Sequence, residues 1–327
     1  MRASIALRIA LLLSALSLTT ACPATDQSRT AMTTQDPIVT YYIGRFTVQA
    51  PQSMKVAHRT ASLRFTELKE VTWTTSLDHN VVREDIWNKR LSEIQELKPP
   101  RGKEKTLIEA KVRSSTPWIA GVIYYGDQYS TKTMFWEMLF DSSDVGLWLK
   151  QDGTDKMLME DNGMEIARAY RVIDPKNPPK ENWFYLKHGA IALPYLEQEE
   201  TYTRFEGHPL FEQIKIETTE VHQDEPKEEG LIGRLAATVA SGYAGGVDIK
   251  KIRARDRVVA GLNGEEVVTK MSDEDGVKLS FMWRHAGKKD SGKEPKILIM
   301  GDAQDGQLDE KLKVWDAILD SFKPAGR

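Results

Sequence analysis

The sequence predicts an α+β protein of two domains, each a mainly antiparallel sheet packed with one or two helices. Three observations favour this fold class. Short segments of alternating apolar residues recur along the chain, and longer segments carry apolar residues at helical spacing. An acidic stretch with nothing to pack interrupts the pattern at residues 220–230. The body that begins near Ile38 has about 290 residues, and chains of that length usually divide into domains of about 100 to 200 residues.

The first 21 residues have the features of an export signal. Arg2 and Arg8 precede an apolar run at residues 9–18, and small residues then lead to Cys22, the only cysteine of the chain. The run is shorter than the roughly 20 apolar residues that a permanent membrane-spanning helix needs. We therefore predict that residues 1–21 are a signal peptide that is removed on export.

Two alternatives remain open for Cys22. Either its thiol receives a diacylglyceryl group and the chain is cleaved before it, or ordinary cleavage after Ala21 leaves a free thiol. An odd cysteine in an exported protein needs a separate reason, which favours the lipid anchor. Pro23 stands where the usual inner-membrane retention signal has aspartate, so we expect the periplasm and the inner face of the outer membrane. Residues 22–37 are mostly small and polar, as is typical of a flexible tether.

We place an N-terminal α+β domain at residues 38–222. Its first strand alternates apolar and polar residues and ends at Pro51. A helix at residues 80–97 follows from an apolar stripe at helical spacing, with Asn80 as its N-cap, and a second helix is predicted at residues 154–170. The same alternation predicts further strands at residues 61–65, 71–75, 107–112, 119–125, 134–149 and 183–193.

We place a C-terminal α+β domain at residues 231–327. The dipeptides Asn263-Gly264 and Asp275-Gly276 suit two-residue hairpin turns, because their residues tolerate positive φ, and they predict an antiparallel meander. A wide apolar stripe predicts a closing helix at residues 307–322 that lies on the sheet. The strands of the meander are predicted at residues 248–253, 257–262, 265–270, 278–283 and 296–299.

Charge and motifs exclude several functions. Removal of residues 1–21 lowers lysine plus arginine from 45 to 43 against 48 acids, which gives a formal charge of -5 and argues against a nucleic-acid partner. The six histidines lack a second ligand at metal-binding spacing. The sequence has neither a Gly-x-Ser-x-Gly elbow nor a Walker-type loop. We therefore predict no catalytic residue, no cofactor and no metal site.

The sequence also argues against a glycosidase site built from paired acids. Glu265 and Glu266 are adjacent in a predicted strand, so their side chains point to opposite faces and cannot share one substrate. This pair and the group Glu197, Glu199 and Glu200 are explained more simply as solvated surface in a chain with 48 acids.

Several short motifs resemble a known family. The segment YIGRFTVQAP at residues 42–51 is similar to the opening strand of lipoprotein immunity proteins that protect bacteria from type VI secretion phospholipase effectors. RVVAGLNGEE at residues 257–266, FMW at residues 281–283, Pro295 and the closing apolar helix at residues 312–322 resemble the C-terminal domain of that family. The similarity extends over nearly all of the chain after the signal peptide.

The resemblance implies a two-domain periplasmic protein that binds a phospholipase effector and blocks its active site or lid, without catalysis of its own. The polar linker between the domains would suit a clamp. Two alternatives stay open: an envelope scaffold lipoprotein without a toxin partner, and a hydrolase whose site is assembled from distant residues.

The candidate partner contacts are residues that the sequence places in loops or polar stretches. They comprise an aromatic residue beside a proline and two groups of acids, which would steer a basic partner surface. Each also has a simpler explanation as solvated loop. The candidates are Trp118, Glu197, Glu199, Glu200, Asp224 and Glu225.

Overall fold

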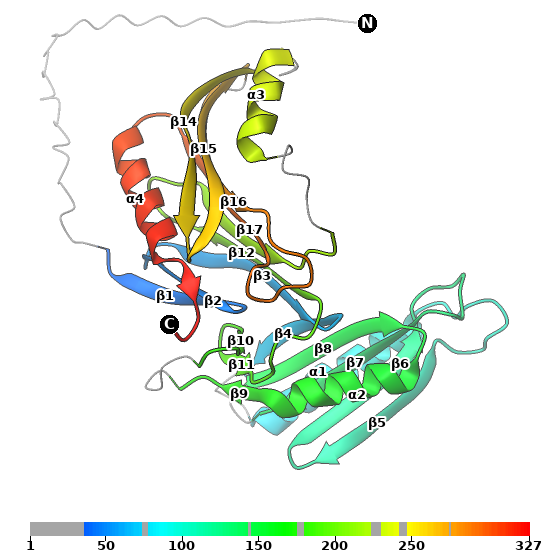
Figure 1. The fold of residues 1–327 in the computed structure, drawn as a ribbon. Helices are drawn as coiled ribbons and strands as arrows, with labels where there is room; N and C mark the ends of the chain where they lie inside the picture. Colours follow the sequence, from blue (N-terminus) through cyan, green and yellow to red (C-terminus); the bar gives the residue numbers. More distant parts are fainter. Residues whose placement is uncertain are drawn as a thin grey trace, which may run out of the picture. The chain divides into compact units, whose positions relative to one another are not determined.

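The computed structural model describes residues 36–73, 78–142, 145–174, 180–223, 230–241, 247–274 and 276–327 (Figure 1). Residues 36–327 form one compact unit. The predicted signal peptide, Cys22 and nearly all of the predicted tether lie outside the described residues, as do Asp224 and Glu225. No described helix is long and apolar enough to cross a membrane.

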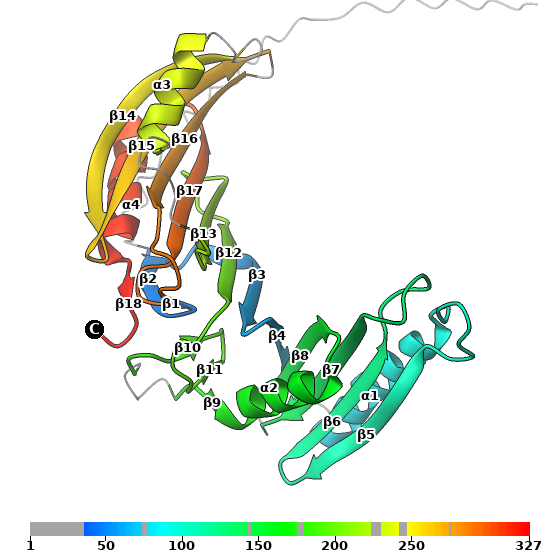
Figure 2. The same cartoon turned by 45° about the vertical axis from the view of Figure 1, so that its right-hand side comes forward.

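Most of the described strands belong to a twelve-stranded sheet in which every neighbouring pair is antiparallel (Figures 1 and 2). The predicted α+β, mainly antiparallel fold is therefore confirmed. From one edge to the other, the strands are β14 (Asp248–Val259), β15 (Leu262–Asp273), β16 (Gly276–His285), β17 (Lys296–Gln304), β13 (Gln213–Thr219), β12 (Glu199–Glu206), β3 (Lys55–Leu63), β4 (Thr66–Thr72), β8 (Val145–Gly153), β7 (Met134–Asp141), β6 (Trp118–Tyr125) and β5 (Leu107–Ser115).

Two smaller sheets and the helices complete the described fold. One small sheet contains β1 (Ile38–Ile43), β2 (Phe46–Pro51) and β18 (Lys323–Pro324), and the other contains β9 (Tyr170–Val172), β10 (Phe184–Tyr185) and β11 (Gly189–Ile191). The helices are α1 (His79–Glu96), α2 (Lys156–Ala169), α3 (Leu231–Ser241) and α4 (Leu308–Ser321). The helix at residues 80–97 is thus confirmed to within one residue, although Asp78 rather than Asn80 caps it by accepting a hydrogen bond from the Asn80 backbone.

Strand β6 has helices on both of its faces. Ile119 and Ile123 pack in the hydrophobic cluster that contains residues of α2, whereas Ala120, Val122 and Tyr124 pack in the cluster of α1. Successive side chains of a strand point to opposite faces, so both faces must be apolar when both are covered. This explains why the segment is continuously apolar rather than alternating.

The largest hydrophobic cluster joins residues from both sides of the predicted linker. Phe46 of β2 and Phe205 of β12 pack with Trp283, Trp315 and Phe322 near the C-terminus, and the Phe46 and Phe322 rings stack with centroids 5.0 Å apart. The part of the chain assigned by sequence to the N-terminal domain therefore supplies strands to the core around α4. Of the polar stretch predicted at residues 220–230, residues 224–229 lie outside the described part of the chain. Its first residues are packed, contrary to the prediction, because Val221 is buried and pairs with Lys289.

The predicted turn at Asn263-Gly264 is wrong. The chain turns instead at Ala260 and Gly261, which have φ of 57° and 79°, and β14 and β15 pair up to Val259 and Leu262. Gly264 lies within β15, where a Cβ atom would stand 2.6 Å from the ring of Trp283. Glycine is therefore needed at this position because an aromatic ring packs closely against the backbone, not because the chain turns there. Asp275 of the second predicted turn lies outside the described residues.

The chain also reverses direction at Arg64 and Phe65, within the strand predicted at residues 61–65. Both residues have positive φ, 50° and 63°, and they join β3 to β4 as a two-residue turn. Only the pairs Ser62–Glu67 and Leu63–Thr66 link the two strands, after which β3 continues along β12 and β4 along β8. This short hairpin therefore joins two groups of strands in the sheet. The first group runs from β14 to β3 in the order given above, and the second runs from β4 to β5.

Candidate functional site

Trp118 begins β6 and is half-buried under α1. The guanidinium carbon of Arg83 lies 4.4 Å from the Trp118 ring centroid, and the ring of Trp87 meets it edge-on at 6.2 Å. Arg83 also donates to Asp141 at 2.8 Å. The guanidinium cation and the electron-rich face of the indole attract each other electrostatically, and this attraction holds the indole in one orientation. Trp118 is thus an ordered, partly accessible aromatic residue rather than the tip of a loop.

The three predicted acids near β12 differ in their surroundings. Glu197 and Glu200 are exposed, whereas Glu199 is only 8% exposed. Glu199 accepts two hydrogen bonds from Arg45, at 2.5 and 2.7 Å, and Arg45 also donates to the backbone oxygen of Leu193. Burial raises the pKa of Glu199, while the pairing with Arg45 opposes that rise. Of the three acids, only Glu197 and Glu200 therefore present a free carboxylate at the surface.

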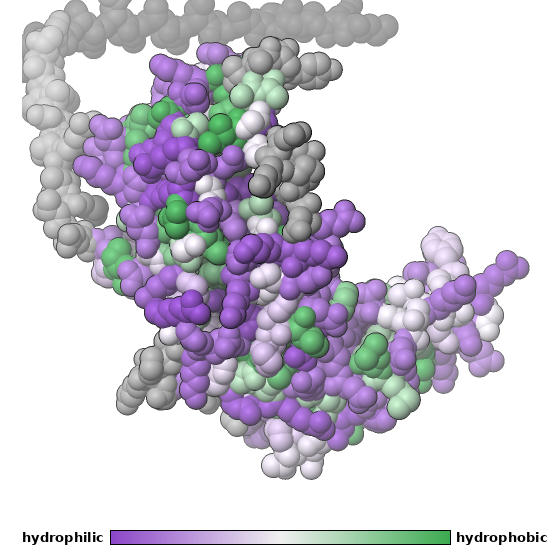
Figure 3. Space-filling model, in the orientation of Figure 1, coloured by the Kyte–Doolittle hydropathy of each residue, from purple (hydrophilic) through white to green (hydrophobic). Residues whose placement is uncertain are grey.

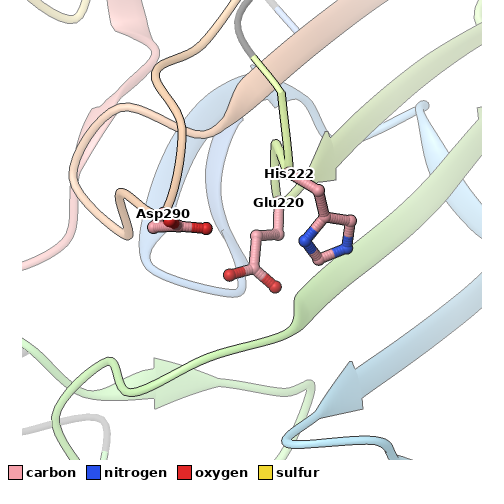
Figure 4. Close-up of side chains that lie close together, drawn as sticks. All are labelled: Glu220, His222 and Asp290. Atoms are coloured by element: carbon pink, nitrogen blue, oxygen red, sulfur yellow. The ribbon is translucent and has the colours of Figure 1, made fainter.

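A second group of side chains lies beside this ion pair. Glu220 and His222 follow β13, and Asp290 comes from the loop between β16 and β17 (Figure 4). One ligand atom from each lies within 4.8 Å of the others. The hydroxyl of Tyr195 donates to Glu220 at 2.6 Å. Sequence reasoning missed this group because Asp290 is distant in the chain and spacing alone could not pair it with His222.

A small cavity of about 10 Å³, room for about one water molecule, adjoins both groups. Its lining includes Arg45, Glu199, Tyr195 and Glu220. Burial, followed by the hydrogen bond to Glu220, raises the pKa of Tyr195, so this phenol stays protonated and donates at neutral pH. The region is therefore a polar junction between β2, β12 and the loop that carries Asp290.

An arginine–acid cluster connects β14, β15 and α4. Glu266 is fully buried and accepts from Arg253, Arg255 and Arg257 at 2.9, 2.7 and 3.3 Å. Trp315 donates to the same carboxylate at 3.0 Å. Burial alone would raise the pKa of Glu266, but the hydrogen bonds from the arginines outweigh it and the pKa lies below its ordinary value.

The expectation for Glu265 and Glu266 is confirmed in part. Glu266 points toward α4, and Glu265 points elsewhere and accepts a hydrogen bond from the backbone of Ile232 in α3. Glu266 is nevertheless not the solvated surface acid that the sequence favoured, because its arginine partners make its burial tolerable.

The described surface shows mainly polar residues in Figure 3, with small separate apolar patches. A groove of about 360 Å³ lies at the end of the β14–β15 hairpin, where Val258 is 62% exposed. Its lining residues are Asp256, Arg257, Val258, Asn263, Gly264 and Glu265. Along β14, basic residues predominate at Lys250, Lys251, Arg253, Arg255 and Arg257.

Residues 177–325 match the protein family described as Tle cognate immunity protein 4 C-terminal domain. No curated protein matches the chain.

Solved structures match over most of the chain. The apo structure of immunity protein TplEi of T6SS from Pseudomonas aeruginosa is similar with a TM-score of 0.70 and 20% identity, covering 88% of this chain and 97% of that one. A chain in the crystal structure of the Tle4–Tli4 complex gives a TM-score of 0.71 and 18% identity, covering 89% and 99%.

A third structure, TplEi complexed with "L" peptide, gives a TM-score of 0.67 and 17% identity, covering 90% of this chain and 100% of that one. Because the sequence identities are 20% or less, these matches show a shared fold. They cover at least 88% of the chain and so include both groups of strands in the sheet. Residues 177–325 therefore match the Tle cognate immunity protein 4 C-terminal domain, and the chain as a whole has the fold of the TplEi and Tli4 structures.

Proposed function

We propose that this protein is a periplasmic immunity protein that binds and inhibits a cognate type VI secretion phospholipase effector by covering its active site or lid. The observation that carries the proposal is the match of residues 177–325 to the Tle cognate immunity family. The likeness to a chain from the Tle4–Tli4 complex, over 89% of this chain, supports the same conclusion. In this proposal the protein itself catalyses no reaction.

Inhibition of this kind needs only a complementary buried surface. An interface of standard size hides about 800 Å² on each partner, and a few anchors contribute most of the affinity. Trp118 is a candidate anchor because its ring is already ordered by Arg83 and Trp87, so little side-chain entropy is lost on binding. Glu197 and Glu200 are candidates for steering, since their carboxylates are exposed.

The clamp is retained as a proposal in which both groups of strands contact the effector. Trp118 lies in β6, in the group of strands from β4 to β5, and Glu200 lies in β12, in the group from β14 to β3. Cutting the chain at residues 223–230 would be a poor test, because the cluster around Trp315 takes residues from both sides. Point substitutions in the two parts test the clamp without exposing that core.

The location at the envelope is a further part of the proposal. Residues 1–21 would direct export, and a lipid on Cys22 would hold the protein at the inner face of the outer membrane. Each buried CH₂ of a lipid chain contributes roughly 0.8 kcal/mol, so several chains would anchor it firmly. Mass spectrometry of the mature N-terminus distinguishes a lipidated Cys22 from a free thiol.

The decisive experiment combines binding with inhibition. The product of a neighbouring lipase gene with Gly-x-Ser-x-Gly is co-purified with the full-length protein, and its phospholipase activity is measured with and without it. We expect a stable complex and loss of activity. An effector that is not bound and remains active would refute the proposal and favour an envelope scaffold.

Variants then locate the interface. We expect Trp118→Ala to weaken inhibition by more than about tenfold, as loss of a hot-spot residue does. Glu197→Lys and Glu200→Lys should slow association most at low salt, because exposed charges act mainly on the on-rate. Glu104→Lys reverses an exposed acid in a different loop and is the matched control. Equal effects of all three charge reversals would show that net charge, not a defined contact, governs association.

A further inference from the structure

Three metal-binding side chains converge where the chain leaves β13. Glu220 and His222 flank Val221, so both point to the same side of this extended segment, and Asp290 faces them from the loop between β16 and β17 (Figure 4). One ligand atom from each side chain lies within 4.8 Å of the others. His222 and Asp290 are exposed, so their side chains are free to rotate toward a common ion.

The backbone already holds the two segments together. The amide of Asp290 donates to the carbonyl oxygen of Val221 at 2.9 Å, and Val221 forms a parallel bridge with Lys289. Asp290 has a φ of 51°, in the left-handed region that costs a non-glycine residue energy. The ligand positions are therefore set by fixed main-chain contacts rather than by two independent loops.

Glu220 is oriented and incompletely satisfied. Its Oε1 accepts from Tyr195 at 2.6 Å, whereas its Oε2 is buried and has no hydrogen-bond partner in the described part of the chain. A buried carboxylate oxygen without a donor is costly. Asp290 adds a second carboxylate within 4.8 Å, and its ion pair with Lys289, at 3.9 Å, is exposed to solvent. A cation between these groups would satisfy Oε2 and reduce the repulsion.

We propose that Glu220, His222 and Asp290 bind a zinc ion. The donor set of one imidazole and two carboxylates suits Zn²⁺, whereas Mg²⁺ and Ca²⁺ prefer oxygen ligands alone. Three protein ligands leave a fourth tetrahedral position for water. Tyr195 would act as a positioning residue, because its hydrogen bond fixes the carboxylate of Glu220. The ion would cross-link the end of β13 to the loop that contains Asp290.

The proposal concerns metal binding by this chain alone and does not depend on any effector. Purified full-length protein is stripped with a chelator and titrated with Zn²⁺ by calorimetry, and with Co²⁺ to record the visible absorption of a tetrahedral site. We expect one ion per chain and a rise in the thermal unfolding midpoint. Mg²⁺ at the same concentrations should produce neither effect.

Variants assign the ligands. His222→Ala and Asp290→Asn should each abolish the Co²⁺ spectrum and lower Zn²⁺ affinity by more than about 100-fold, exceeding the usual effect of a residue outside the ligand set. Tyr195→Phe should keep the spectrum and weaken binding by about tenfold. His58→Ala removes another exposed histidine and should change nothing.

His222 and Asp290 are exposed, so their variants are expected to fold, and circular dichroism checks this. Absence of one-to-one Zn²⁺ binding by the wild-type protein would overturn the proposal. Binding that survives both His222→Ala and Asp290→Asn would overturn it equally, because the ion would then lie elsewhere.

Discussion

The substitution Glu266→Gln tests whether the arginine–acid cluster stabilises the fold. The change keeps the shape of the side chain and its acceptor for Trp315, but removes the charge that Arg253, Arg255 and Arg257 surround. Removing one partner of a buried ion pair usually costs about 3–5 kcal/mol, because the remaining charge stays buried.

The lower end of that range applies here. Arg255 is half exposed and can turn toward water, and Asp316 still pairs with Arg253 and Arg257 at 2.8 and 2.5 Å. We therefore expect a loss of about 3 kcal/mol. With a urea dependence of about 3 kcal/mol per M, the unfolding midpoint falls by about 1 M.

Urea unfolding followed by tryptophan fluorescence measures this loss, because Trp283 and Trp315 are both buried in the core next to α4. Glu200→Gln removes an exposed carboxylate and should change stability by less than about 0.5 kcal/mol. A Glu266→Gln midpoint equal to that of Glu200→Gln would refute the assigned role of the cluster.

The pH dependence provides an independent check on the same cluster. The pKa values of Glu266 and Asp316 are lowered in the folded protein: burial raises both, but the arginine hydrogen bonds outweigh it. A carboxyl with a lowered folded pKa binds more protons when unfolded, so its stabilisation is complete above its ordinary pKa, 4.5 for Glu266, and is lost as pH falls through the folded value. Glu266→Gln should therefore flatten the fall of the urea midpoint below that pH, and an unchanged slope would contradict the assignment.

Three further substitutions test other parts of the fold. Leu319→Ala empties a fully buried site in α4 and should cost about 2–5 kcal/mol in urea unfolding, whereas Leu196→Ala at an exposed site should cost less than about 0.5 kcal/mol. Phe65 is 58% exposed and has a backbone in the left-handed region, which asparagine adopts at lower energy. Phe65→Asn should therefore raise the stability by roughly 1 kcal/mol. A lower melting temperature of the variant would show that the Phe65 ring makes stabilising contacts. Gly264→Ala forces a Cβ atom to 2.6 Å from both the Arg284 carbonyl oxygen and the Trp283 ring and should cost about 1–3 kcal/mol. An unchanged melting temperature would mean that both the strand and the ring shift freely.

The elements with a strong local signal could be predicted from the sequence. The closing helix begins at Leu308 and ends at Ser321, close to the predicted residues 307–322, because Trp315, Ile318 and Leu319 repeat at helical spacing and are all buried. An antiparallel meander was also expected, but the predicted strands at residues 248–253 and 257–262 are one continuous strand, β14, with an irregularity in pairing between Lys251 and Arg253. The turn at Ala260-Gly261 was misplaced by three residues, because Asn263-Gly264 is the stronger local turn signal. Gly264 is instead needed because a Cβ atom there would clash with the ring of Trp283.

Elements that depend on distant partners could not be predicted. β12 and β13 went unrecognised because their buried faces include polar residues: Thr201 and Thr218 hydrogen-bond to each other at 2.7 Å, and Glu199 pairs with Arg45, 154 residues away. The sequence shows which residues are polar, but not that a long-range partner satisfies them in the interior. The same limit concealed the meeting of His222 with Asp290.

The basic residues along β14 bear on how copies of the protein behave at high concentration. β14 is the outermost strand at one end of the described sheet and carries the exposed Lys250 and Lys251, whereas its three arginines are paired with Glu266 and Asp316. Charged side chains on an edge strand disfavour its pairing with another chain, so these two lysines would oppose edge-to-edge aggregation. A crowded population of these molecules would thus remain separate partly through the lysines of this strand.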